Sequence, residues 1–171
     1  MYGRPLLPSI ARDPGQAYQR PMAKKLFTIG YERASLPQLV ALLRSAKVKA
    51  LIDVRELPNS RRAGFSKRIL ASTLEEAGIG YTHLKALGTP KAGREANKAG
   101  RMKEFWKIVD ASLDRPEAMM ALEQAAEIAG KKTVCLLCLE HDHAVCHRSR
   151  VAEMLAARGF KVTHLEPAAW V

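Results

Sequence analysis

This chain of 171 residues lacks several features that mark large classes of proteins. No uninterrupted apolar run approaches the roughly 18–20 residues that a membrane-spanning helix needs, so no membrane partner is expected. Three cysteines are too few for a disulfide-stapled secreted fold, and they favour a reducing, cytoplasmic location. The P-loop, a Gly-x-Gly-x-x-Gly turn after the first strand, the phosphotyrosine-phosphatase cradle and the zinc-deaminase signature are all missing. The sequence therefore leaves any cofactor unknown.

The length and composition predict one folded domain with an irregular arm before it. Apolar residues make up 47% of the chain, which is enough for a hydrophobic core and excludes global disorder. Residues 1–23 carry four prolines and two glycines without any periodicity, so they are expected to form an irregular N-terminal arm. Residues 24–171 are expected to form a single domain.

Strand and helix patterns alternate along this domain. The expected strands lie at residues 26–31, 48–55, 79–84, 133–139 and 160–165. Capping boxes predict that helices begin after Ser35 and after Asp114. The alternation predicts an α/β fold: a mainly parallel sheet of about five strands with helices on both faces, a Rossmann-like three-layer sandwich. In such folds ligands bind beyond the carboxyl ends of the strands.

The net charge of +11 is concentrated in the middle of the chain. Residues 55–103 contain eleven basic and only four acidic side chains. This excess favours an anionic partner, such as a phosphorylated small molecule, a nucleotide or a nucleic acid. Residues 87–101 are rich in Lys and Arg and are interpreted either as a mobile lid over the ligand or as an ordinary solvated loop.

The exit of the second strand carries several candidate ligand-binding residues. Asp53 and Arg55 alternate onto one face, so Asp53 is a candidate for proton exchange and Arg55 for anion binding. Ser60 and Arg61 extend this candidate site. The alternative is an ion pair that stitches the strand end to the next loop. Phe65 lies among basic residues and either stacks on a base or packs under the following helix.

The exit of the fourth strand brings thiols, imidazoles and carboxylates together within residues 138–148. Cys146 is expected at a helix N-terminus, which would stabilise its thiolate as a nucleophile, with His147 as base. Glu140 is a candidate for proton exchange and Arg148 for anion binding. A second interpretation is a metal site built from Cys138, Cys146 and histidines, and a third is purely structural packing.

Cys135 and Cys138 form a Cys-x-x-Cys pair, but residues three apart in a strand point to opposite faces, so Cys135 is expected in the core.

Four motifs in order resemble one known family: TIGY, DVRELPNSRRAGFSK, GIGYTHLKALG and LLCLE followed by CHR. They resemble the uncharacterised prokaryotic family catalogued as domain of unknown function 488, which includes the YeaO-like proteins. The resemblance covers about residues 26–166 and implies a compact α/β domain without a settled function. The matching positions include Tyr31, at the exit of the first strand, which is added to the candidate ligand-binding residues.

Three functions stay open at this point: an enzyme acting on an anionic ligand, a non-catalytic module that binds nucleic acid or phosphate, and a small metal-binding domain. The sequence does not settle whether the protein is an enzyme, nor its oligomeric state.

Overall fold

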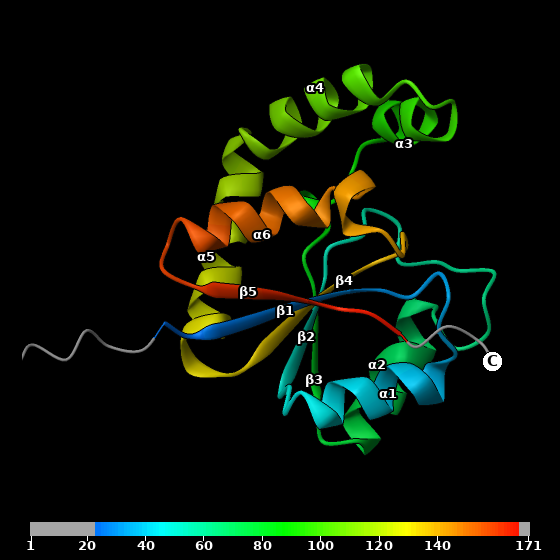
Figure 1. The fold of residues 1–171 in the computed structure, drawn as a ribbon, viewed down its shortest axis with the longest axis vertical. Helices are drawn as coiled ribbons and strands as arrows, with labels where there is room; N and C mark the ends of the chain where they lie inside the picture. Colours follow the sequence, from blue (N-terminus) through cyan, green and yellow to red (C-terminus); the bar gives the residue numbers. More distant parts are fainter. Residues whose placement is uncertain (1–22, 168–171) are drawn as a thin grey trace, which may run out of the picture.

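A computed structural model describes residues 23–167, which fold around one sheet of five parallel strands (Figure 1). The strands are β1 (Lys25–Gly30), β2 (Ala50–Asp53), β3 (Gly80–His83), β4 (Val134–Cys138) and β5 (Lys161–Leu165). Their order across the sheet is β3-β2-β4-β1-β5. The predicted α/β fold with a parallel sheet is confirmed. Apart from Ala23, the predicted N-terminal arm lies outside the described residues.

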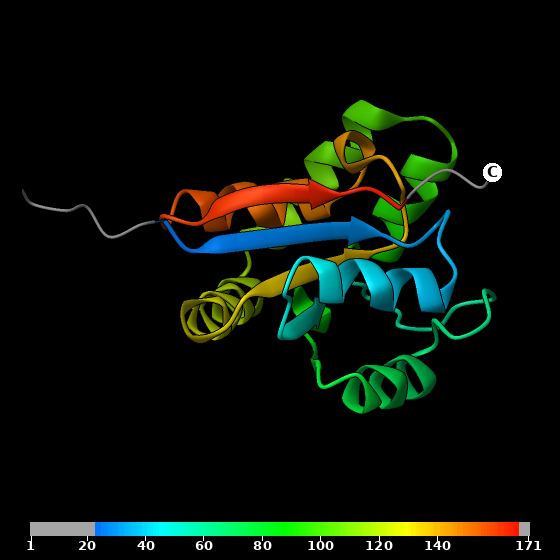
Figure 2. The ribbon, with the colours of Figure 1, turned by 60° about the horizontal axis from the view of Figure 1, so that its bottom comes forward.

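Helices cover both faces of the sheet (Figures 1 and 2). On one face lie α1 (Leu36–Ser45) and α2 (Lys67–Glu76), whose leucines pack against the sheet. The other face is covered by α4 (Met102–Leu113), α5 (Pro116–Lys131) and α6 (Arg148–Ala156). A further helix, α3 (Lys91–Lys98), packs on α4, and two short 3-10 turns are η1 (Lys85–Leu87) and η2 (His143–Val145). No helix within residues 23–167 is long and apolar enough to cross a membrane.

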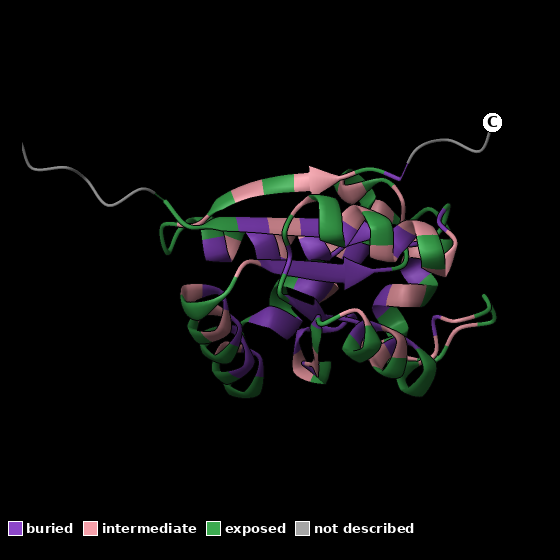
Figure 3. Cartoon of the chain, turned by 90° about the horizontal axis from the view of Figure 1, so that it is seen from below, coloured by how far each residue is buried: buried purple, intermediate pink, exposed green. Residues whose placement is uncertain are grey.

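The side chains of β4 alternate between the two cores. Val134, Leu136 and Cys138 belong to the core under α4–α6, whereas Cys135 and Leu137 belong to the core under α1 and α2. All five residues of the strand are buried, in agreement with the buried sheet centre in Figure 3. The expectation that Cys135 is a core residue facing away from Cys138 is therefore confirmed.

Helix boundaries agree with the predictions at Ser35 and differ from them in two other places. The capping box at Ser35 is present, since Ser35 Oγ accepts a hydrogen bond from the Gln38 amide and Gln38 returns one to the Ser35 amide. The box expected at Asp114 is absent: α5 begins after Arg115 with a proline in its first turn, and Asp114 ends α4 instead. The helix expected from Cys146 begins at Arg148.

Residues 87–101 are not the extended loop that their Gly and Lys content predicted. Most of them form α3, which buries Gly93 and Ala96 and packs on α4. Gly93 fits closely there, because a Cβ at this position would lie 2.6 Å from a methyl carbon of Thr89. A mobile lid is therefore wrong for this segment, and its small residues serve helix packing instead.

Because all five strands are parallel, their carboxyl ends lie together at one end of the sheet. From β1 the chain crosses to α1 on one face, whereas from β4 it crosses to α6 on the opposite face. Because β1 and β4 are neighbours, the point where the winding direction changes lies between them. This is the usual place for a ligand crevice in an open α/β sheet.

Candidate functional site

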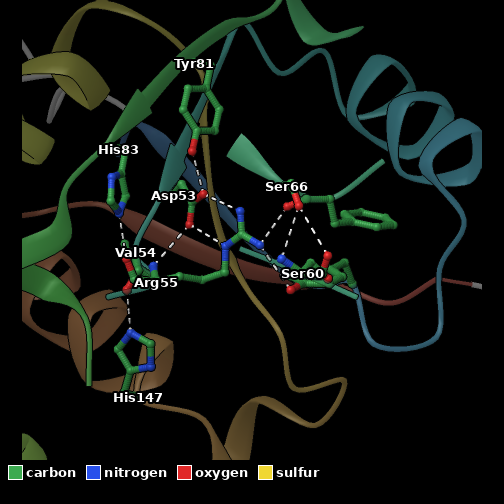
Figure 4. A network of polar contacts seen from close by, with 10 residues as sticks. Asp53, Val54, Arg55, Ser60, Ser66, Tyr81, His83 and His147 are labelled. Atoms are coloured by element: carbon green, nitrogen blue, oxygen red, sulfur yellow. Dashed lines mark hydrogen bonds and ion pairs between the residues drawn. The ribbon is translucent and has the colours of Figure 1, made fainter. Parts of the chain in front are cut away.

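A buried ion pair closes the end of β2 (Figure 4). Arg55 donates from Nε to Asp53 Oδ1 at 2.8 Å and from Nη2 to Asp53 Oδ2 at 2.6 Å, a forked pairing of guanidinium and carboxylate. Asp53 is 0% exposed and Arg55 is 5% exposed. Burial alone would lower the pKa of Arg55, but the hydrogen bonds and charge of Asp53 outweigh it and raise that pKa. The pair thus holds the first residues of the following loop against the end of β2.

The other donors of Arg55 are engaged with protein groups as well. Nη1 donates to the Tyr31 hydroxyl at 3.0 Å and to the Phe65 carbonyl at 2.9 Å. The Tyr31 ring stacks on the Phe65 ring with centres 4.3 Å apart, and both rings are buried. The predicted ligand-binding roles of these three residues do not fit this packing, because each side chain is already used to hold the others.

Two residues of β3 complete this network. The Tyr81 hydroxyl donates to Asp53 Oδ2 at 2.6 Å, and burial together with this carboxylate raises the pKa of Tyr81. His83 Nε2 lies 2.7 Å from the Arg55 carbonyl oxygen. Sequence reasoning missed Tyr81 and gave His83 no role. The pairing of β2 with β3, which sets Asp53 beside His83, is what brings them in, and no local pattern reveals it.

A second cluster contains two thiols and an imidazole. The ligand atoms of Cys138, Cys146 and His147 lie within 4.8 Å of one another, and all three residues are buried. His147 Nδ1 is 3.6 Å from Cys138 Sγ, and Cys138 Sγ is 3.3 Å from a carboxylate oxygen of Glu140. His147 Nε2 bonds the Val54 carbonyl at 2.8 Å, which joins this cluster to the end of β2.

The environment of Cys146 differs from the reactive one that was predicted. The helix begins two residues after Cys146, at Arg148, and the residues before Cys146 form η2. Cys146 is 0% exposed, and burial raises the pKa of its thiol well above the ordinary value. The expected low-pKa thiolate is therefore wrong for this environment, since the sulfur is buried away from solvent.

Arg148 also lies in the interior and not in a ligand site. It is 1% exposed and forms no salt bridge within the described chain. Its guanidinium donates to the carbonyls of Glu140 and His141 and to the hydroxyl of Thr28. In this structure Arg148 holds the loop after β4 in place, and its anion-binding role stays a prediction.

The crevice expected between β1 and β4 is closed by backbone pairing. Beyond the strand ends, the Tyr31 amide donates to the Cys138 carbonyl at 3.1 Å, and the Glu32 amide donates to the Leu139 carbonyl at 2.8 Å. The Glu32 carboxylate then accepts a hydrogen bond from the His141 amide. These contacts extend the sheet over the place where a ligand would enter.

Exposed cations gather instead on the segment that leads from β2 into α2. Arg61, Lys67 and Arg68 are exposed, and none of them forms a salt bridge within residues 23–167. Beside them lies an open groove of about 650 Å³, lined by Asn59, Ser66, Lys67, Arg68, Ile69, Ser72 and Thr73. The basic content of residues 55–103 was the signal for this surface, although the prediction named only Arg61 of its cations.

Hydrogen bonds within the segment fix its shape. Ser66 Oγ donates to the Ser60 carbonyl at 3.2 Å and accepts from the Ser60 amide at 3.3 Å. Ser60 Oγ accepts from the Arg62 amide, and the Arg62 side chain donates to the Ala34 carbonyl at 2.8 Å. Of the predicted site residues, Ser60 therefore shapes this surface and Arg61 is exposed on it, whereas the others are buried or partly buried at the strand exits.

Comparison with known proteins locates the chain in one family. No curated protein and no solved structure matches it. A family model with the description "Domain of unknown function DUF488" matches residues 35–155, which is most of the folded chain and includes the cationic segment, the second buried cluster and all of the first except Tyr31. The chain belongs to this family of unknown function.

Proposed function

We propose that the protein binds an anionic, phosphate-bearing ligand on the surface formed by residues 59–73, and that this surface acts by binding rather than by catalysis. The observation that carries the proposal is the open groove lined by Lys67 and Arg68, with Arg61 exposed on the same segment and none of the three paired with an acid among the described residues. Cations that line a groove and have no acidic partner favour the binding of an anion there.

The polar groups of the groove suit a phosphodiester or phosphate. Asn59, Ser72 and Thr73 are among the residues that line it, and side chains of these types bond phosphate oxygens in nucleic-acid complexes. The groove lining contains no cysteine, histidine or carboxylate that would act as nucleophile or base. Binding is therefore favoured over catalysis at this surface. The catalytic roles predicted for Asp53, Glu140, Cys146 and His147 would require the buried strand exits to open.

The rigidity of the segment supports the same function. Arg55 donates to the Phe65 carbonyl, and the Lys67 amide donates to the Pro58 carbonyl at 2.9 Å. The loop is thus tied to the buried ion pair before any ligand arrives, which lowers the entropic cost of binding. A cytoplasmic location, where nucleic acid and phosphorylated metabolites are abundant, belongs to this proposal and agrees with the three unpaired thiols.

The test is a titration of the full chain against a fluorescein-labelled single-stranded oligonucleotide at several salt concentrations. Replacing both Arg61 and Arg68 with Gln should weaken binding about tenfold or more, and it should reduce the slope of log K against log salt by about 1.4, because each lost phosphate contact to a single strand removes roughly 0.7. Competition with pyrophosphate distinguishes a small phosphate ligand from a polynucleotide.

The matched control removes two exposed cations from the opposite face of the sheet. Lys103 and Lys107 lie on α4, and neither is in a salt bridge of the described chain. Replacing both with Gln should leave the affinity within about twofold of the wild type. Equal losses in the two double variants, or no salt-sensitive retention of any oligonucleotide or phosphate, would contradict the proposed function.

A further inference from the structure

The proposed function does not use the buried cluster of Cys138, Cys146 and His147. These residues come from two elements, the end of β4 and the turn before α6. Their ligand atoms nevertheless lie within 4.8 Å of one another, with the residues 4%, 0% and 5% exposed. Thiolates and imidazoles are the common protein ligands of zinc, and a closed structural site needs a fourth donor beside these three.

The spacing of the donor atoms fits a tetrahedral metal ion. Bonds of about 2.3 Å from zinc to sulfur and about 2.0–2.1 Å to nitrogen place neighbouring donors about 3.6–3.8 Å apart in a tetrahedron. Cys138 Sγ and His147 Nδ1 are separated by 3.6 Å. An ion bound to both of these atoms would need no change in the distance between them.

The orientation of the His147 ring supports ligation through Nδ1. Its Nε2 lies 2.8 Å from the Val54 carbonyl oxygen, and a carbonyl can only accept a hydrogen bond, so Nε2 carries the proton (Figure 4). In the neutral ring, Nδ1 then has a free lone pair, and it faces the sulfur of Cys138. Metal-binding histidines are typically fixed in this way, with the second ring nitrogen donating to a carbonyl or carboxylate.

Glu140 is the candidate for the fourth ligand. One of its carboxylate oxygens lies 3.3 Å from Cys138 Sγ, and its backbone carbonyl accepts a hydrogen bond from Arg148. It is not among the residues whose ligand atoms all lie within 4.8 Å of one another, so its side chain must turn toward the ion to complete the set. Two thiolates neutralise a divalent ion, and the Glu140 carboxylate leaves the centre with one negative charge. Arg148 is a buried cation whose only partners among the described residues are carbonyls and a hydroxyl, so an anionic centre would supply the counter-charge that it lacks.

We propose that Cys138, Cys146, His147 and Glu140 bind one zinc ion in a closed, structural site. The two thiolates select a borderline-soft metal over magnesium or calcium. Because His147 bonds the carbonyl next to Asp53 and Arg55, the ion fixes the end of β2, from which the cationic segment begins. This site is separate from the groove of the proposed function, so each can be tested without the other.

The first experiment measures metal in the untagged full-length chain, purified in reducing buffer without chelator. Elemental analysis should find about one zinc per chain, and stripping the metal should lower the melting temperature, since structural zinc contributes to folding. Cobalt(II) loaded in place of zinc should give the visible absorption of a tetrahedral ion together with a thiolate charge-transfer band. The cobalt spectrum uses the wild-type chain and therefore does not depend on whether any variant folds.

Variants assign the ligands. Replacing Cys146 with Ala, or His147 with Gln, should weaken zinc binding by more than about 100-fold, because even the loss of a second-shell partner costs roughly 10–100-fold. Replacing Glu140 with Gln should weaken it less and shift the cobalt bands. The matched control is Cys135→Ala, which removes a buried thiol from the opposite face of the same strand and should leave zinc affinity unchanged.

Three results would overturn the proposal. The first is a reduced, folded chain that takes up neither zinc nor cobalt. The second is a cobalt spectrum typical of an octahedral ion without thiolate ligands. The third is an equal loss of zinc in Cys135→Ala and Cys146→Ala, which would show that metal retention reflects general stability. An unchanged affinity and spectrum in Glu140→Gln would remove Glu140 from the ligand set.

Discussion

The backbone carbonyl of Glu140 lies directly against the Cα of Gly30, so closely that a Cβ on residue 30 would overlap the oxygen. The chain can make this contact because β1 and β4 continue to pair beyond their ends, where the Tyr31 amide bonds the Cys138 carbonyl. The same Glu140 carbonyl accepts a hydrogen bond from Arg148. The pairing of β1 and β4 beyond their carboxyl ends therefore depends on a residue without a side chain at the end of β1.

The first prediction is that Gly30→Ala is strongly destabilising. The added methyl group meets backbone atoms of Glu140 and His141, which cannot move without breaking the bonds that close the edge. Overpacking of this kind costs about 1–3 kcal/mol, and the upper end is expected here because the clash is with backbone. Urea denaturation of the two proteins measures the change in the free energy of unfolding.

Gly80→Ala is the matched control. Gly80 begins β3, and the nearest atom to a Cβ placed there is the Lys49 carbonyl oxygen at 3.7 Å, an ordinary contact distance. Its effect should stay within about 0.5 kcal/mol. If Gly30→Ala unfolds at the same urea concentration as Gly80→Ala, the tight approach of the two strand ends is not what closes this edge.

The fold was predictable because its signals are local and mutually consistent. Alternating strand and helix patterns predicted all five strands, and the side-chain period of two correctly separated Cys135 from Cys138. The same period placed Asp53 and Arg55 on one face, and the structure pairs them. These inferences depend only on geometry within one strand, which the sequence carries directly.

The exposure of the candidate site could not be read from the sequence in the same way. Whether Arg55 faces solvent depends on Tyr31 and Phe65, which belong to the exits of other elements and cover it. Arg148 is buried where the loop after β4 accepts its hydrogen bonds, and Cys146 belongs to the core under α4–α6. The pattern of reactive residue types therefore led correctly to the carboxyl end of the sheet, but it did not show that the side chains there are buried.

The second prediction concerns the Asp53–Arg55 pair. Asp53→Asn keeps the shape of the side chain but leaves Arg55 as a buried cation without a counter-charge, and it weakens the hydrogen bond from Tyr81. Breaking a buried ion pair from one side costs about 3–5 kcal/mol, so a large drop in the free energy of unfolding is expected. Urea denaturation at neutral pH measures it.

An exposed pair provides the comparison for this variant. Asp110 is 52% exposed and bonds Arg150 at 2.9 Å. Asp110→Asn should cost less than about 1 kcal/mol, because solvent screens an exposed pair and the side chains lose freedom in forming it. Similar losses in the two variants would mean that burial does not strengthen the dependence of Arg55 on Asp53.

The third prediction is a dependence of stability on pH that arises at His164. Its ring stacks on His143 with centres 3.6 Å apart, and its Nδ1 lies 2.7 Å from the Thr28 hydroxyl. Arg148 Nε donates to that hydroxyl oxygen, and in the neutral ring with its proton on Nε2 the hydroxyl donates to His164 Nδ1. Protonation of His164 at Nδ1 would remove the acceptor of this hydrogen bond. Partial burial, His143 and Arg148 lower the pKa of His164.

The sign of the effect follows from this lowered pKa. An unfolded histidine takes up its proton near pH 6.5, whereas folded His164 takes it up only at lower pH. Between the two values the unfolded chain binds more protons, so this contribution to stability is fully present above about pH 6.5 and is lost as the pH falls through the folded pKa. Melting temperatures from pH 7.5 to pH 5 should therefore fall more steeply for the wild type than for His164→Gln, in which Gln still accepts from Thr28. All other titrating groups are shared by the two proteins, so parallel curves would show that His164 binds its proton equally well in the folded and the unfolded chain.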